Sequence, residues 1–162
     1  MNETKRLSQV AKPSQVAKPS QAAKPSQGAA LPADELLAAS RRSLAEASVA
    51  STSAERYAAA HLGALRAAAA VLAERGKPAR RRGRVLSVWA VLPQVAPELA
   101  EWAQFFAAGA RKRQAAEAGI ACVSHREADD LVRDADTFVA RVAHLLGRAY
   151  QPALGHVLLH VG

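Results

Sequence analysis

Residues 124–147 read SHREADDLVRDADTFVARVAHLLG, the clearest amphipathic pattern in the chain. Ser124 and Glu127 form an S-x-x-E capping box, which is typical of a helix start, and the closing glycine marks the helix end. Asp129 and Arg133 are four residues apart, as an ion pair on a solvated helix face would be. The opposite face is apolar, and this pattern predicts a long amphipathic helix. Its apolar stripe consists of Ala128, Leu131, Val132, Ala135, Phe138, Val139, Val142 and Leu146.

Three more helical segments precede this one. Residues 97–118 predict a long helix with an apolar face of Leu99, Trp102, Phe106 and Ala110. Residues 52–75 begin at a second capping box, Thr52 with Glu55, and continue with a face of Tyr57, His61, Ala64, Leu65, Ala68 and Leu72. Residues 35–47 predict the first helix. Each apolar face requires the others to cover it.

The composition agrees with a helical fold. Half of the residues are hydrophobic but only 4% are aromatic, so much of the apolar content is alanine, a strong helix former. A short apolar segment, SVWAVLPQV at residues 87–95, connects two of the helices. At 162 residues, one core is expected. We therefore predict an all-α fold, a bundle of about four helices over residues 31–147.

The N-terminal part is repetitive. From Ser8 the chain reads SQVAKP, SQVAKP and SQAAKP, with proline closing each six-residue unit. Proline at this spacing prevents helix propagation, and the units hold almost no large apolar side chains to offset the entropy of ordering. We predict that residues 1–30 form a disordered basic tail. Residues 148–162 are expected to be a short C-terminal tail, either docked or frayed.

The formal charge of +8 is concentrated in two places. The N-terminal tail carries five cations and one glutamate, a net +4, and the loop KPARRRGR at residues 77–84 carries five more cations. The rest of the chain holds 12 cations and 13 anions, and is nearly neutral. An acidic partner would therefore meet the loop or the tail rather than the bundle surface as a whole.

Cellular location is constrained by what the sequence lacks. The single cysteine, Cys122, excludes an intramolecular disulfide framework. No apolar stretch follows the charged start, as a secretory signal would require, and no run reaches the roughly 18 to 20 apolar residues of a membrane span. We expect a cytoplasmic protein with no membrane partner.

The succession of ERYAAAHLGALRAAAAVL at residues 55–72, PELAEWAQFFAAGARKRQAAEAG at 97–119 and the stretch at 124–147 resembles an actinobacterial branch of the HEPN superfamily of small helical bundles. The resemblance covers residues 34–146 and leaves out the repeat tail. It implies association with RNA or nucleotides, often as a dimer. Many members of the superfamily cleave RNA without a metal ion, whereas others are noncatalytic, so the resemblance leaves both possibilities for this chain.

Catalytic HEPN domains carry an arginine followed by a histidine after four to six residues, and Arg56 and His61 match this spacing. An imidazole can exchange the proton of a ribose 2′-hydroxyl, and a guanidinium can stabilise charge on the phosphate. The match departs from the family pattern, since the motif usually lies near the last helix and a polar residue commonly stands where Tyr57 does. Five positions on a helix also place the two side chains about 140° apart. The alternative is that His61 is a partly buried packing residue.

The candidate nucleic-acid contacts lie in the basic loop and in a second cluster that extends it if the helix over 97–118 returns to the same end. Arginine forks and lysine charges hold phosphates without reading sequence. No aromatic residue lies inside the run, so base stacking is not supported by it. The alternative is a solvated loop. The candidates are Lys77, Arg80, Arg81, Arg82, Arg84, Arg111, Lys112 and Arg113.

Metal and cofactor signatures are weak. Cys122 with His125, and His156 with His160, have zinc-like spacing, but neither pair completes a tetrahedral set. The aspartates of residues 129–136 are interleaved with Arg126, Arg133 and the apolar stripe, as on a solvated, ion-paired surface. No P-loop, dinucleotide-binding or serine-hydrolase motif occurs. We expect no metal and no cofactor.

Two functions remain. The first is an RNA- or nucleotide-associated HEPN-like domain with weakly supported ribonuclease activity through Arg56 and His61. The alternative is a noncatalytic protein-interaction domain. The sequence leaves open whether the protein is an enzyme and favours a noncatalytic role.

Overall fold

The computed structural model describes residues 31–76, 86–150 and 152. Within these residues the chain forms five α-helices, one 3-10 turn and no strand, so the all-α prediction is confirmed. None of the described helices has the length and hydropathy to cross a membrane. The elements are α1 (Ala33–Val49), α2 (Ser53–Arg75), α3 (Val88–Val95), η1 (Pro97–Leu99), α4 (Ala100–Glu117) and α5 (His125–Leu145).

Three predicted segments lie outside the described residues. These are the repeat tail of residues 1–30, the basic loop of residues 77–84, and the C-terminal residues from 153 onward. Their predictions stay predictions.

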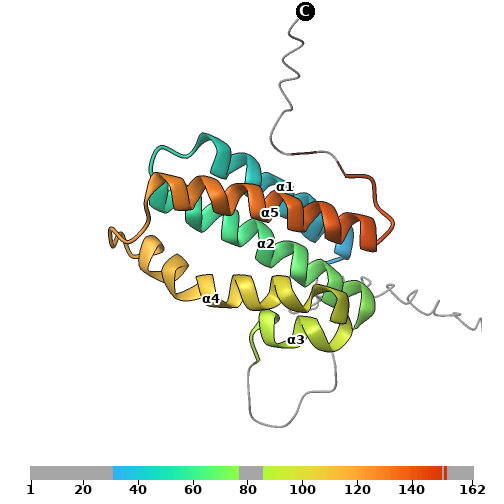
Figure 1. Ribbon diagram of the computed structural model, residues 1–162. Coiled ribbons are helices and arrows are strands. Elements are labelled where there is room, and N and C mark those ends of the chain that lie inside the picture. Colours follow the sequence, from blue (N-terminus) through green and yellow to red (C-terminus); the bar gives the residue numbers. More distant parts are fainter. Residues whose placement is uncertain (1–30, 77–85, 151, 153–162) are drawn as a thin grey trace, which may run out of the picture.

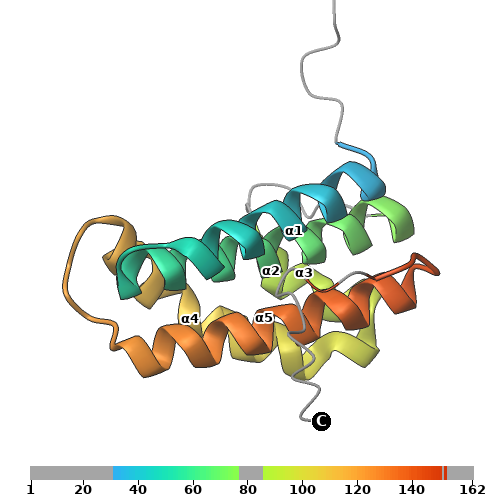
Figure 2. The ribbon, with the colours of Figure 1, turned by 90° about the horizontal axis from the view of Figure 1, so that it is seen from above.

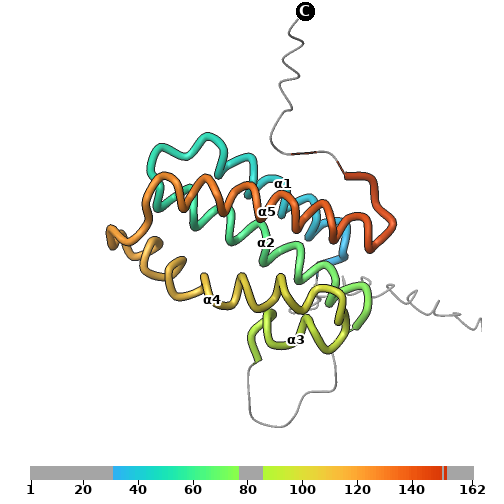
Figure 3. Tube along the Cα trace, viewed as in Figure 1, coloured from blue at the N-terminus to red at the C-terminus, as the bar shows by residue number. Residues whose placement is uncertain are grey.

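Helix α2 is the centre of the bundle. In Figure 1, α1 and α5 lie on one side of it and α4 on the other, with α3 next to α4. The chain trace in Figure 3 shows that α1 and α4 run antiparallel to α2, whereas α5 runs parallel to it. The view from above in Figure 2 shows α1 beside α2 along most of its length. The N-terminal ends of α2 and α5 therefore meet at one end of the bundle.

Both predicted capping boxes are present. The Thr52 hydroxyl accepts from the Glu55 backbone N–H, and the Glu55 carboxylate accepts from the Thr52 N–H. Ser124 and Glu127 make the same reciprocal pair at the start of α5. Because each box satisfies backbone donors that the first helical turn leaves free, the starts of these two helices follow from local sequence.

Helix α3 was not predicted as a helix. Residues 87–95 contain Pro93, which normally opposes a helix interior. Here the proline is only two residues from the end of an eight-residue helix, and the Ser87 hydroxyl caps the start by accepting from Ala90 N–H. Trp89 and Leu92 are buried in the core. We attribute the helix to this burial, which adds a fifth helix to the four expected.

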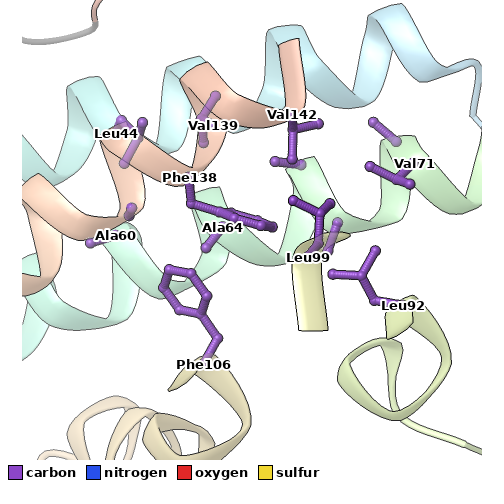
Figure 4. Packing of buried hydrophobic residues seen from close by; sticks show 14 of the residues in the cluster. Leu44, Ala60, Ala64, Val71, Leu92, Leu99, Phe106, Phe138, Val139 and Val142 are labelled. Atoms are coloured by element: carbon purple, nitrogen blue, oxygen red, sulfur yellow. The ribbon is translucent and has the colours of Figure 1, made fainter. Parts of the chain in front are cut away.

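The core is built around aromatic rings where α3, α4 and α5 meet α2. Phe106 of α4 lies between Phe138 of α5 and Trp89 of α3, with ring centroids 5.2 and 5.1 Å away. Figure 4 shows Phe106 and Phe138 pointing toward each other beside Ala64 of α2. All eight residues of the apolar stripe predicted on α5 are buried, which confirms that stripe as the core face.

Helices α1 and α2 approach closely because small residues face each other. A Cβ at Gly63 would stand 3.2 Å from the Leu44 side chain and from the Ser40 carbonyl oxygen. The buried Ser40 hydroxyl donates to the Gly63 carbonyl oxygen over 2.7 Å. The missing side chain at Gly63 thus permits the close approach of the two helices.

The first residues after α5 are docked on the bundle. Arg148 pairs with Asp34 at the start of α1 and with Glu74 at the end of α2. The Tyr150 hydroxyl donates to the Asp136 carboxylate. Of the two states considered for the C-terminal tail, docking therefore holds for residues 148–150.

Candidate functional site

Arg56 lies in the first turn of α2 and faces α5. Its Nη1 pairs with the Asp129 carboxylate over 2.5 Å, and Nη2 donates to the Ala50 carbonyl oxygen. Arg56 and Asp129 line a shallow pocket of about 200 Å³, together with Ser48, Val132 and Arg133. The predicted Asp129–Arg133 pair is wrong, because Asp129 contacts Arg56 and Arg133 pairs with Asp130 instead.

His61 lies in the middle of α2 and faces α4. It is 1% exposed, and its Nε2 is 2.8 Å from the Phe106 carbonyl oxygen. Because a carbonyl oxygen only accepts, Nε2 must carry the proton, and Nδ1 of the neutral ring is buried without a partner among the described residues. Burial lowers the pKa of His61, against the opposing effect of the Phe106 hydrogen bond. The imidazole is therefore a neutral link between α2 and α4.

The structure does not bring Arg56 and His61 to one pocket. His61 lines a separate cavity of about 260 Å³ between α2, α4 and α5, which Arg56 does not line. The helical geometry explains the separation, since five positions on α2 direct the two side chains to different neighbouring helices. The alternative considered for His61 was a partly buried packing residue in an apolar stripe. Its edge contacts with Trp89 and Phe106 agree with a packing role, but at 1% exposure the side chain is fully rather than partly buried.

The second cavity contains polar groups that the sequence pattern did not single out as a set. Tyr57 and His61 of α2 face Gly109 and Lys112 of α4, with Phe105 at the edge. Burial raises the pKa of the Tyr57 phenol, and the nearby Lys112 charge opposes this effect. The spacing of Phe105, Gly109 and Lys112, at four and seven residues on one helix, places them on one face and could have indicated the site.

The basic cluster on α4 lies far from the end of α2 at which the basic loop begins. Lys112 lines the same cavity as Tyr57, near the start of α2, whereas α2 ends at Arg75, about 27 Å further along the helix. Lys112 pairs with Glu127 of α5 and Arg113 with Glu117 on its own helix. The second cluster was expected to extend the basic loop only if its helix returned to the end of the bundle where the loop begins. Helix α4 does not return to that end, so this condition is not met.

The structure places candidate metal ligands only within the described residues. Within them, no group of three His, Cys, Asp or Glu side chains is placed to hold a metal ion. The Cys122 thiol donates weakly to the Lys112 carbonyl oxygen, and His125 is an exposed first residue of α5. His156 and His160 lie outside the described part of the chain.

Comparison with known proteins identifies the family. A family model described as SAV_6107-like HEPN matches residues 47–143, from the end of α1 to the last turns of α5. No curated protein matches the chain, and no solved structure matches it. The family match contains the central helix, both capping boxes and the cavity between α4 and α5. Because it covers more than half of the sequence, the chain belongs to the HEPN family.

Proposed function

We propose that the protein is a noncatalytic HEPN domain that associates with RNA or with nucleotide phosphates. The observation that carries the noncatalytic part is the way in which Arg56 and His61 are held. A general base needs a ring nitrogen that can reach the substrate proton. In His61, Nε2–H is donated to the Phe106 carbonyl and Nδ1 is buried. Arg56 already has a carboxylate partner in Asp129.

Membership of the HEPN family and the basic loop support the association with phosphate groups. The loop concentrates Lys77, Arg80, Arg81, Arg82 and Arg84 in eight residues of an otherwise nearly neutral domain. Such a cluster binds phosphates by releasing counterions, so affinity falls as salt rises and base identity matters little. The proposal includes the dimer expected from the resemblance, for which light scattering should give twice the 17.0 kDa chain mass.

Binding is tested with a labelled single-stranded RNA across a salt series. The variant Arg80→Ser/Arg81→Ser/Arg82→Ser should bind weakly, with a log–log salt slope smaller by up to about 2. A matched control, Arg42→Ser/Arg126→Ser/Arg133→Ser, removes the same charge from exposed helix positions and should retain most of the affinity. Binding by neither wild type nor control at low salt would instead favour a protein-interaction domain.

Catalysis is tested separately by incubating the same RNA with wild type and with His61→Gln. Glutamine can keep a donor toward the Phe106 carbonyl but cannot act as a general base near neutral pH. The proposal expects no difference between the two proteins. Cleavage by the wild type that His61→Gln abolishes, with both proteins equally folded, would overturn the noncatalytic assignment.

A further inference from the structure

The cavity between α4 and α5 has the composition of a small-ligand site. Its floor is α2, its walls are α4 and α5, and its polar groups come from Tyr57, His61 and Lys112. We propose that this cavity binds a single-ring aromatic anion, with the anionic group held by Tyr57 and Lys112 and the ring against Phe105 and Leu131.

The Tyr57 hydroxyl is the first reason. The Tyr57 hydroxyl oxygen lies beside Gly109 in the cavity and makes no hydrogen bond to any described residue. The hydroxyl oxygen is not sealed inside the protein, so a molecule that enters the cavity can reach it. The free phenol therefore offers a donor to an oxygen atom inside the cavity.

Gly109 explains how this hydroxyl fits against α4. A Cβ at this position would stand 2.8 Å from the Tyr57 hydroxyl oxygen and 3.5 Å from the His61 ring. Glycine is unfavourable in the interior of a helix, where alanine would be more stable. The close approach of the tyrosine to the α4 backbone therefore depends on the missing side chain.

Lys112 supplies the charge for an anion. Lys112 lines the same cavity, one turn after Gly109, and its side chain is 37% exposed. It pairs with Glu127 at the start of α5, which is itself half-exposed. An exposed pair of this kind contributes little stability, so a ligand carboxylate or phosphate can replace Glu127 at modest cost.

The apolar side chains of the cavity favour a ligand with an aromatic ring. Phe105 is 45% exposed at the cavity edge, and Leu131 of α5 faces it from inside. An exposed phenyl ring offers a stacking surface that every planar ring can use. The volume of about 260 Å³ is below that of most drug-sized sites, which fits one ring with one anionic group.

This inference does not depend on RNA binding by the basic loop. The ring and the anion could belong to a free aromatic acid or to a nucleotide, and different probes separate these sources. The loop variant Arg80→Ser/Arg81→Ser/Arg82→Ser leaves the cavity residues unchanged. Loss of RNA binding with intact small-ligand binding in that variant would therefore separate the two proposals.

The experiment is an NMR titration of the full chain, using the Gly109 amide as reporter. The probes are benzoate, phenyl phosphate and uridine monophosphate, with inorganic phosphate and benzyl alcohol as probes that carry only one of the two features. Phenyl phosphate should bind at least about tenfold more tightly than either single-feature probe, since both halves of the cavity are then used.

Four variants locate the binding. Tyr57→Phe removes the donor and should weaken phenyl phosphate binding roughly tenfold. Gly109→Ala fills the space beside the hydroxyl and should abolish binding. Lys112→Gln should weaken binding, whereas its matched control Glu127→Gln breaks the same ion pair, keeps a capping residue, and should leave binding equal or tighter.

The outcomes are decisive in either direction. The proposal is overturned if phenyl phosphate binds no more tightly than inorganic phosphate, or if Tyr57→Phe folds normally and binds with unchanged Kd. Equal weakening by Lys112→Gln and Glu127→Gln would also contradict it, because the effect would then come from the helix contact. Stronger binding of uridine monophosphate than of phenyl phosphate would identify a nucleotide as the source of the ligand.

Discussion

The buried imidazole of His61 should make the fold sensitive to mild acid. Burial lowers the pKa of His61 below its ordinary value of 6.5, and the residue is 1% exposed in the native bundle. In the unfolded chain the ring recovers its ordinary pKa. Below pH 6.5 the unfolded chain therefore binds a proton that the native chain does not, and stability is lost as the pH falls through this value.

The size of the effect has an upper limit. If the imidazole stays neutral in the native state, the free energy of unfolding of the protein falls by about 1.4 kcal/mol for each pH unit below 6.5. Between pH 7.5 and pH 5.0 the loss is at most about 2 kcal/mol. Glu127, whose pKa is lowered to about 2 by Lys112 and Ser124, adds no pH dependence in this range. Its contribution is present above pH 4.5 and is lost only as the pH falls toward 2.

The assay is urea denaturation of wild type and His61→Gln, followed by far-ultraviolet circular dichroism at pH 7.5, 6.0 and 5.0. Glutamine keeps an amide donor for the Phe106 carbonyl oxygen and cannot be protonated in this range. The wild type should lose stability toward pH 5.0, and the variant should lose clearly less. Parallel pH profiles for the two proteins would refute the reasoning, because another group would then be responsible.

Three further predictions concern the bundle. Phe138→Ala should lower the free energy of unfolding by about 3–5 kcal/mol in urea denaturation, whereas the exposed Val49→Ala should change it by less than about 0.5 kcal/mol; similar losses would contradict the assigned core. Ser124→Ala removes a capping box and should cost about 1 kcal/mol, measured the same way; an unchanged midpoint would argue against the cap. A double-mutant cycle of Arg56→Gln and Asp129→Asn should give a coupling below about 1 kcal/mol, because the pair is partly exposed; a larger value would show that it is better shielded from solvent.

Much of the fold follows from local patterns. The capping boxes at Thr52 and Ser124 predicted where α2 and α5 begin, because their hydrogen bonds join residues three apart. The apolar stripe on α5 predicted its core face. Helix α3 was missed because Pro93 opposes a helix locally, and the burial of Trp89 and Leu92 that supports it involves distant residues.

The sites were less predictable for the same reason. Spacing on α5 predicted that Asp129 would pair with Arg133, but sequence periodicity cannot show that Arg56 of α2 lies closer. The cavity that we propose as a ligand site takes Tyr57 from α2, Lys112 from α4 and Leu131 from α5. Each of these residues has an ordinary place in its own helix, so no pattern within one helix reveals the set.

The sequence by itself determined the helical class, the start of α2 and α5, the apolar faces and the concentration of charge in two short segments. These features depend on neighbours within about one helical turn, or on composition. The five-residue spacing already separates Arg56 from His61, but which helices they face, and that His61 donates to Phe106, depends on the packing. Only the tertiary structure decided that Gly109 admits the Tyr57 hydroxyl. These facts depend on how helices distant in the chain pack together, which side-chain periodicity does not encode.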